Sequence, residues 1–359
     1  MADLHIRISS LELKNPVICG SGEHTMTAEG IRAAIASGVG AVVAKSVNES
    51  MAAKSQLDKT DYRMVGTDWK PVPWDFNAPQ DASIFCRSGL IQKSFEDWMQ
   101  ELIVLDQQAA REGCYVIPSL ILSDLEQCAA YAQVVEKMGF RVLEVNIGAP
   151  HGDEAAKGAI VLERDASRIE TIVTRLRAAV SLPLWIKLTG QSENPALLAE
   201  AARNSGADAV ILMGRFMGFL PDLDTHKPLL NTSAALGGAW ALPLTARCVA
   251  MSRKRLGPQF PLLATNGARS GLDVARFLLS GAYAVEMTSL VLMRGYGALT
   301  ESVNELNTYL DSQGKSASQL IGLAADQLQS YAEQDDRPQI WRKFCPPAQP
   351  GTPSTELPY

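Results

Sequence analysis

At 359 residues the chain is long enough to bury its own core, and its 33 basic and 39 acidic residues argue against a nucleic-acid-binding surface. Its six cysteines include no C-x-x-C pair, the close spacing that structural zinc and cysteine-ligated iron–sulfur clusters need, so we expect no metal. The sequence has no apolar signal core and no run that approaches about 18 apolar residues. We therefore expect a soluble, cytoplasmic protein without nucleic-acid or membrane partners.

The first segment, 5–13, alternates apolar and polar residues, which is typical of a β-hairpin. Eight short apolar runs then follow in chain order at 16–20, 41–45, 115–121, 142–147, 184–188, 209–213, 261–265 and 284–288. Near-continuous apolar runs of this kind indicate a parallel sheet that is covered on its outer face.

Amphipathic helical patterns follow these runs, at 27–37, 95–112, 125–138, 165–180, 195–205, 244–255, 271–280 and 297–312. Eight strand–helix pairs predict an α/β fold, a (β/α)₈ TIM barrel, in preference to a doubly wound sheet, which usually stops at about five to seven strands. We expect the barrel to occupy 1–315, with a C-terminal extension at 316–359 that lies on the barrel or on a partner.

Three of the predicted strands are followed by long connections, 46–94, 148–164 and 214–243. In a barrel these connections lie at the carboxyl ends of the strands, where catalytic groups are placed. Two lysines, Lys45 and Lys187, end the second and fifth strands and are costly there without an anionic partner. They could pair with Glu144, Glu286 or Asp208, one could form a Schiff base with substrate, or they could face an electron-rich cofactor ring.

The last two predicted strands end in polar, glycine-containing turns. Asn266-Gly267 follows the seventh strand, and Met287-Thr288-Ser289 closes the eighth. Backbone N–H groups at this place in a barrel commonly hold phosphate, although Asn-Gly is also ordinary turn chemistry. The pattern favours a phosphate-bearing cofactor.

Several motifs occur in the order of a known family: NP at 15–16, GSGxHxMT at 20–27, VAKS at 43–46, EVNIGAPHG at 144–152, IKLT at 186–189, GG at 237–238 and TNG at 265–267. With these motifs the chain resembles the class 1 dihydroorotate dehydrogenases and the flavin domain of dihydropyrimidine dehydrogenase, over about residues 11–309. The resemblance implies an FMN cofactor and a homodimer. It also implies FMN contacts from Gly20, Ser21, Gly22, Lys45, Ser46, Asn146, Lys187, Gly237, Gly238, Asn266, Gly267, Met287, Thr288 and Ser289. Among these, Lys187 would stabilise negative charge on the reduced ring.

The sequence departs from this family where substrate is bound. The family's catalytic cysteine or serine falls on Ala149, which cannot move a proton. Its substrate asparagines fall on Phe85 or Cys86 and on Gly214-Arg215, and only Asn146 remains. We therefore predict a small cyclic substrate other than dihydroorotate. The alternative is a dihydroorotate or dihydropyrimidine dehydrogenase with a replaced base.

Four side chains are candidates for the missing acid or base: His151, which we favour because it titrates near neutrality on the same loop, and His24, Cys86 and Glu23. The two histidines and Cys86 also have a structural interpretation, as backbone-bonded histidines and a small buried cysteine. Arg215, with Asn146 and Cys86, is a candidate for binding substrate, and an arginine would suit an anionic group. It could equally be a solvated loop residue. Phe216, Met217, Phe219 and Leu220 could form an apolar wall for an aromatic substrate or pack the loop.

Three functions remain open from the sequence. The first is an FMN-dependent oxidoreductase with hydride transfer at flavin N5 on a C–C or C–N bond. The second is a lysine Schiff-base lyase, and the third is a flavin-binding subunit that docks on an electron-transfer partner. Since no cysteines are spaced for a cluster, electrons must leave to a soluble acceptor or to a separate chain.

Overall fold

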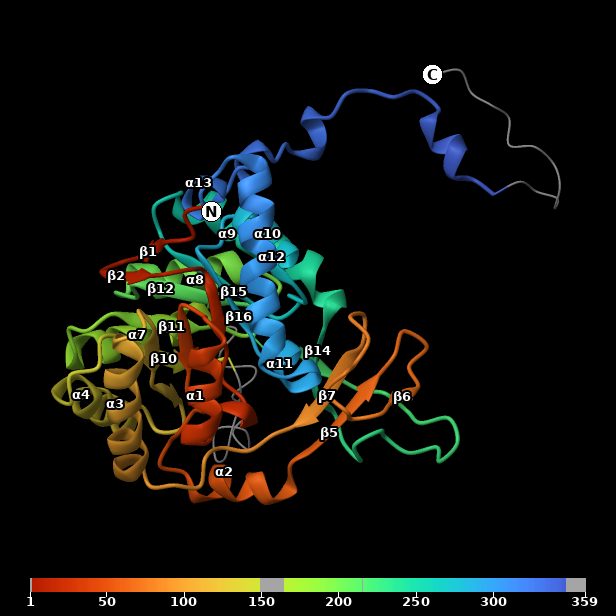
Figure 1. Cartoon of the computed structure of the whole chain (residues 1–359). Coiled ribbons are helices and arrows are strands. Elements are labelled where there is room, and N and C mark those ends of the chain that lie inside the picture. The colour runs from red at the N-terminus through yellow and green to blue at the C-terminus, as the bar shows by residue number, and fades with distance from the viewer. Residues whose placement is uncertain (1, 149–164, 215, 347–359) are drawn as a thin grey trace. The chain divides into compact units, whose positions relative to one another are not determined.

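The structure, a computed structural model, describes residues 2–148, 165–214 and 216–346 (Figure 1). Met1–Asp326 forms one compact unit and Gln327–Tyr359 a second. The first unit therefore runs beyond residue 315, and it includes the short helix α13 (Ala317–Leu320), whose Ala317 N–H donates to the Asp3 carbonyl at 2.8 Å. The described part of the second unit contains only short helical turns, at Tyr331–Glu333 and Ile340–Phe344.

The first unit is built on a ring of parallel strands, which confirms the predicted TIM barrel. In spatial order the strands are β8 (Tyr115–Ile117), β4 (Ala41–Val43), β3 (Val17–Cys19), β16 (Ala284–Met287), β15 (Leu262–Thr265), β12 (Ala209–Leu212), β11 (Leu184–Lys187), β10 (Leu143–Asn146) and β9 (Ser119–Ile121). β8 and β9 are two halves of one predicted run, which is interrupted at Pro118 because proline has no N–H to donate. The ring closes through this run, as the Glu144 N–H donates to the Pro118 carbonyl at 3.1 Å.

Helices surround the ring in the predicted places. They are α1 (Ala28–Ala36), α3 (Phe95–Ala110), α4 (Leu125–Lys137), α7 (Ala166–Ala179), α8 (Pro195–Asn204), α9 (Leu242–Leu256), α10 (Gly271–Leu279) and α12 (Gly297–Gln313). Their starts have a local cause, for example the Thr27 hydroxyl, which accepts from the Gly30 N–H at 3.1 Å and caps α1. The predicted hairpin is β1 (Ile6–Ile8) and β2 (Leu11–Leu13). None of the helices described is long and apolar enough to cross a membrane.

A second sheet, which the sequence did not predict, forms from two of the long connections. Its order is β13 (Phe216–Gly218), β14 (Ala234–Gly238), β7 (Ser83–Arg87), β5 (Asp61–Val65) and β6 (Pro71–Val72), all antiparallel. β5, β6 and β7 come from the connection after β4, and β13 and β14 from the connection after β12. The pairing of β7 with β14 therefore ties together two loops that are far apart in the sequence.

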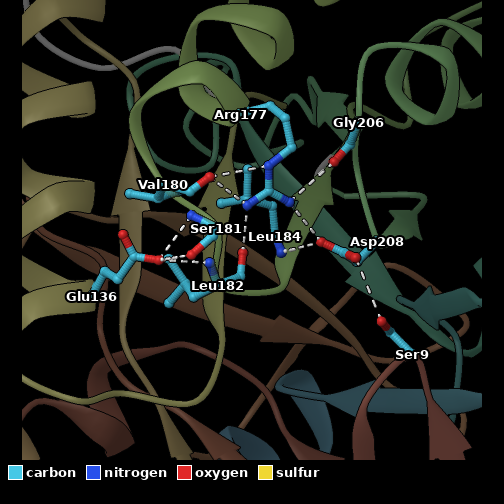
Figure 2. A network of polar contacts seen from close by, with 9 residues as sticks. All are labelled: Ser9, Glu136, Arg177, Val180, Ser181, Leu182, Leu184, Gly206 and Asp208. Atoms are coloured by element: carbon cyan, nitrogen blue, oxygen red, sulfur yellow. Dashed lines mark hydrogen bonds and ion pairs between the residues drawn. The ribbon is translucent and has the colours of Figure 1, made fainter.

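An arginine-centred network lies where the α7–β11 and α8–β12 connections meet (Figure 2). The Arg177 guanidinium donates to the Val180 carbonyl at 2.6 Å and to Asp208 Oδ2 at 2.9 Å. Asp208 Oδ2 also accepts from the Leu184 N–H at 2.8 Å, and Asp208 Oδ1 accepts from the Ser9 hydroxyl at 3.4 Å. Asp208 precedes β12 and is thus at the amino end of the barrel strands. It is not the partner of either lysine at the carboxyl end.

Candidate active site

A hollow of ≈ 1080 Å³, open to solvent, lies at the carboxyl ends of the barrel strands. Each of the eight strand positions contributes to its lining, through Ser21, Lys45, Ile121, Asn146, Lys187, Gly214, Thr265 and Met287. Catalytic and binding groups collect at this end of TIM barrels because the strands converge there and the following loops surround them. The hollow is therefore the candidate active site.

The second sheet forms one wall of the hollow. Side chains alternate between the two faces of a strand, so directly opposed residues in neighbouring strands share a face. Tyr62 on β5 is opposite Cys86 on β7, which is opposite Ala235 on β14, and Ile84 is opposite Gly237. All five line the hollow. The wall is largely apolar, with one phenol and one thiol.

One end of the hollow is shaped by glycines. Asn266 and Gly267 have φ of 70° and 112°, a left-handed conformation that favours glycine at position 267. The Gly238 N–H donates to Asn266 Oδ1 at 3.4 Å, which brings the end of β14 to the turn after β15. A Cβ on Gly237 would lie 2.9 Å from the Ser289 hydroxyl. The two predicted phosphate-binding segments thus meet at one place.

The base of the hollow contains a buried charged cluster. Lys187 ends β11, and its ammonium group lies 3.3 Å from Glu144 Oε2 and in contact with Glu286 Oε2. Glu144 and Glu286, on β10 and β16, have relative exposures of 0% and 1%. Of the partners considered for Lys187, the pairing with Glu144 and Glu286 is confirmed.

Burial and mutual repulsion control the protonation of this cluster. Burial and the neighbouring Glu144 charge raise the pKa of Glu286 to about 8, although Lys187 opposes the shift. Burial would lower the pKa of Lys187, but the two carboxylates outweigh that effect and leave it raised. Lys187 therefore stays protonated at neutral pH. A protonated amine has no lone pair for a carbonyl carbon, so this geometry speaks against a Schiff base on Lys187.

A row of hydroxyl groups leads from the hollow to this cluster. The Ser119 hydroxyl donates to Glu144 Oε1 at 2.8 Å, and the Ser46 and Ser119 hydroxyl oxygens are 2.8 Å apart. Ser21 and Ser46 are 3.5 Å apart, at the limit of a hydrogen bond, and both line the hollow. The row connects the solvent-facing side of the site with Glu144.

The second strand-end lysine has a different setting, near the rim. Lys45 Nζ donates to Glu23 Oε1 at 3.0 Å and to the Ser88 hydroxyl at 2.9 Å. The Ser88 hydroxyl donates to Glu23 Oε1 at 2.6 Å, and the Tyr62 hydroxyl contacts Glu23 Oε2. One carboxylate therefore serves one lysine and two hydroxyl groups.

The four candidate acid–base residues lie in different places. Glu23 and Cys86 line the hollow. His24 is not among its lining residues: its Nε2–H donates to the Gly20 carbonyl at 3.0 Å, and burial lowers the pKa of its ring to about 4. It is a neutral, backbone-bonded histidine beneath the glycine turn, so the geometry does not support a catalytic role for it. His151, with Ala149, lies outside the described residues.

The predicted substrate contacts are also separated. Asn146 and Cys86 line the hollow, whereas Arg215 lies outside the described residues. Of the two possibilities for Phe216, Met217, Phe219 and Leu220, a wall for an aromatic substrate is not supported, since none of these side chains lines the hollow. Phe216 instead packs edge-on against Trp240, with ring centroids 5.3 Å apart, and Phe219 is exposed.

Most of the other FMN contacts implied by the resemblance line the hollow: Gly22, Lys45, Ser46, Lys187, Gly237, Asn266, Gly267, Met287, Thr288 and Ser289. Gly20 and Gly238 are next to lining residues in the chain. The sequence analysis did not predict that Tyr62 lines the hollow. It named Glu286 as a possible partner of the lysines but not as a lining residue. A signal existed for Glu286, because a carboxylate inside an otherwise apolar strand is costly without a purpose. Tyr62 gave no such signal, since its place depends on the second sheet.

Comparison with known proteins adds the family. The family model described as dihydroorotate dehydrogenase matches residues 3–310. The chain belongs to the dihydroorotate dehydrogenase family. It is therefore a flavin-dependent oxidoreductase, and FMN is the cofactor of this family.

Two curated relatives are named dihydroorotate dehydrogenase B (NAD(+)), catalytic subunit. The protein from Methanocella arvoryzae is 28% identical over 319 residues, which cover 88% of this chain and 95% of the relative. That from Thermoplasma acidophilum is 24% identical and covers 90% and 99%. A solved structure of dihydroorotate dehydrogenase from Eimeria tenella in complex with ferulenol has a TM-score of 0.70 at 16% identity and covers 89% of this chain and 88% of its own. That likeness shows the same fold.

The residues around the hollow are suited to bind FMN, the cofactor of the dihydroorotate dehydrogenase family. A Cβ on Gly20 would lie 2.3 Å from Thr288 Oγ1, so only glycine lets the turn after β3 pack directly against the end of β16 beside the hollow. Lys187 offers a cation at the base, and the meeting of Gly237 with Asn266-Gly267 offers N–H groups to an anion. These groups would hold the ring and the phosphate respectively.

Proposed function

We propose that the protein is an FMN-dependent oxidoreductase that acts on a CH–CH bond of a small cyclic substrate other than dihydroorotate. Bound FMN supplies a two-electron acceptor for a hydride at N5. The chain's own residues bind the ring, place a cation beneath it and shape the space above it.

The apolar wall of the second sheet carries the substrate proposal. Ile84, Cys86 and Ala235 face the hollow, and among the described lining residues the amide side chains are those of Asn146 and Asn266. A pyrimidine ring has several amide edges, and each edge left unpaired costs about 1–3 kcal/mol. Alanine at position 149, where the family has its base, supports the same conclusion.

Lys187 and the carboxylates around it would adjust the charge next to the ring. A cation near the pyrimidine side of the flavin favours the reduced, more negative form. Here two carboxylates oppose that cation, so the protonation of Glu286 decides the net charge of the cluster. Lys45, held by Glu23, would contact the flavin from the rim.

We also propose that electrons leave to a separate chain. The relatives are named as catalytic subunits, which implies at least one further subunit in those enzymes. The cysteines of this chain are not spaced to ligate a cluster. A homodimer belongs to the same proposal.

The test is anaerobic reduction of the FMN-loaded protein by a panel of compounds. The panel contains dihydroorotate, dihydrouracil and cyclic carboxylates with a saturated CH–CH bond, and loss of the oxidised flavin absorbance is followed. We expect a non-pyrimidine compound to bleach the flavin and dihydroorotate to leave it oxidised. Rapid, saturable bleaching by dihydroorotate would instead make the protein a dihydroorotate dehydrogenase with a replaced base.

A further inference from the structure

The buried cluster beneath the flavin site contains more negative than positive charge. Glu144 and Glu286 face one ammonium, that of Lys187, and both carboxylates are inaccessible to solvent. Glu144 Oε1 accepts a hydrogen bond from Ser119. Neither oxygen of Glu286 accepts a well-aligned hydrogen bond from the residues described, and Glu286 Oε2 is in contact with the Lys187 ammonium.

Two carboxylates in one buried site do not both ionise readily. Each charge loses its hydration there, and one cation offsets only one of the two. A single proton shared by Glu144 and Glu286 leaves one negative charge opposite Lys187 and a net charge of zero. The raised pKa of Glu286 is consistent with that state.

The other ionisable groups around Glu286 do not replace this proton. Cys19 on β3 is fully buried, and burial together with Glu286 raises the pKa of its thiol, so it stays neutral. His24 is neutral because burial lowers its pKa. At the rim, Glu23 and Lys45 pair with each other. The elements packed against Glu286 thus leave Lys187 and Glu144 as the charges that control it.

The cluster is also next to the place where the flavin would lie. Lys187 and Glu286 both line the hollow, and a Cβ on Gly20 would lie 3.6 Å from Glu286 Oε2. The row Ser21, Ser46 and Ser119 leads from the hollow to Glu144. A proton therefore has a short hydroxyl route between solvent and the carboxyl pair.

We propose that Glu144 and Glu286 hold one proton between them beside Lys187, and that this proton is coupled to the reduction of bound FMN. The inference rests on the proposed flavin chemistry. Reduction by a hydride adds negative charge to the ring. Where the pair has lost its proton, reduction draws one proton from solvent through the serines to a carboxylate oxygen. No electron moves to the cluster, and the proton is returned to solvent on reoxidation.

This coupling predicts a break in the pH dependence of the flavin midpoint potential. Below a pH of about 8 the pair is already protonated, and uptake of one proton with two electrons changes the reduction equilibrium tenfold per pH unit, about 30 mV. Above that pH the pair starts without its proton and takes one up on reduction, so two protons accompany the two electrons. The change then becomes a hundredfold per pH unit, about twice the slope.

The experiment measures the midpoint potential of the FMN-loaded protein against redox dyes across this pH range. We expect the break in the wild type and a single tenfold slope in Glu286→Gln, which keeps the shape but cannot take the proton. Glu23→Gln, which removes the other lysine-paired carboxylate of the site, should keep the break. If Glu286→Gln does not fold, Glu144→Gln should lose the break in its place.

A wild-type slope without a break overturns the inference, as does a break that persists in Glu286→Gln. These results leave the oxidoreductase proposal standing, because they are obtained on flavin that is bound and reducible. Failure of the protein to bind FMN overturns both. Failure of every compound in the substrate panel affects only the proposed substrate class, since the potentials are measured without substrate.

Discussion

The barrel has two clusters of paired positive and negative side chains, one at each end of its strands, and their charges are compensated in different ways. Arg177 at the amino end donates to the carbonyls of Val180, Leu182 and Gly206 as well as to Asp208, and Asp208 accepts from backbone and side-chain donors (Figure 2). Lys187 at the carboxyl end faces two carboxylates that have few other partners.

The comparison distinguishes a structural network from a functional one. Neutral backbone groups share the charge of Arg177, and both Arg177 and Asp208 retain contact with solvent. The two carboxylates of the Lys187 cluster are buried and outnumber its one cation, so the protonation of the cluster depends on its surroundings. Charges that are buried without full compensation are typical of sites where charge changes during the reaction.

Removal of Lys187 should have the largest effect. Lys187→Met leaves two buried carboxylates without a cation, and losing one partner of a buried ion pair costs about 3–5 kcal/mol. We expect that loss in chemical denaturation, and flavin reduction slower by orders of magnitude. Adding Glu286→Gln should restore part of the stability. Unchanged reduction kinetics in Lys187→Met would remove Lys187 from the mechanism.

Removal of Arg177 should affect stability alone. Arg177→Ala removes the donor shared by three backbone carbonyls and one of the donors to Asp208, and the loss of these hydrogen bonds costs about 1–3 kcal/mol. Denaturation should show that loss, while the potential of bound FMN should match the wild type. A shifted potential would show that the two ends of the barrel are coupled.

The stability of the protein should depend on pH through Glu286. Its folded pKa of about 8 is above the ordinary value of 4.5, so the folded state binds more protons between these values. This contribution is present at low pH and is lost as pH rises to about 8, at no more than about 1.4 kcal/mol per pH unit. Urea denaturation of the wild type and Glu286→Gln checks the sign. The free energy of unfolding of the wild type, relative to that of Glu286→Gln, should fall as pH rises.

The smallest effect is expected at Ser119. Ser119→Ala removes one donor to Glu144 and one link of the hydroxyl row, and a hydrogen bond of this kind contributes about 1 kcal/mol. We expect that loss of stability and slower proton exchange with the cluster, without a change in the final potential. Ser21→Ala, at the long 3.5 Å contact, should leave the stability close to that of the wild type.

The sequence predicted the barrel well because each strand and helix has a local pattern. The apolar run at 184–188 became β11, with Lys187 at its end, and Thr27 capped α1. The second sheet was not predictable in this way. The pairing of β7 with β14 depends on two loops meeting over the barrel rather than on any pattern within either loop.

The residues of the candidate site were likewise predictable where they lie on barrel strands and unpredictable where they lie on the second sheet. The strand-end residues Lys45, Asn146 and Lys187 could be placed from the barrel alone, since strand ends converge at its mouth. Tyr62 could not, because its place depends on the register of the second sheet. The partners of Lys187 were among the alternatives from the sequence, and three-dimensional distances were needed to choose them.

The most direct test of the charge comparison is the infrared difference spectrum of the FMN-loaded protein between neutral pH and a pH well above the pKa of about 8. The account predicts a carbonyl stretch of a protonated, buried carboxylic acid at neutral pH that disappears at high pH. This band should be absent from Glu286→Gln and present in Asp208→Asn. A wild-type spectrum without the band, or a band unchanged in Glu286→Gln, would contradict a shared proton beneath the flavin.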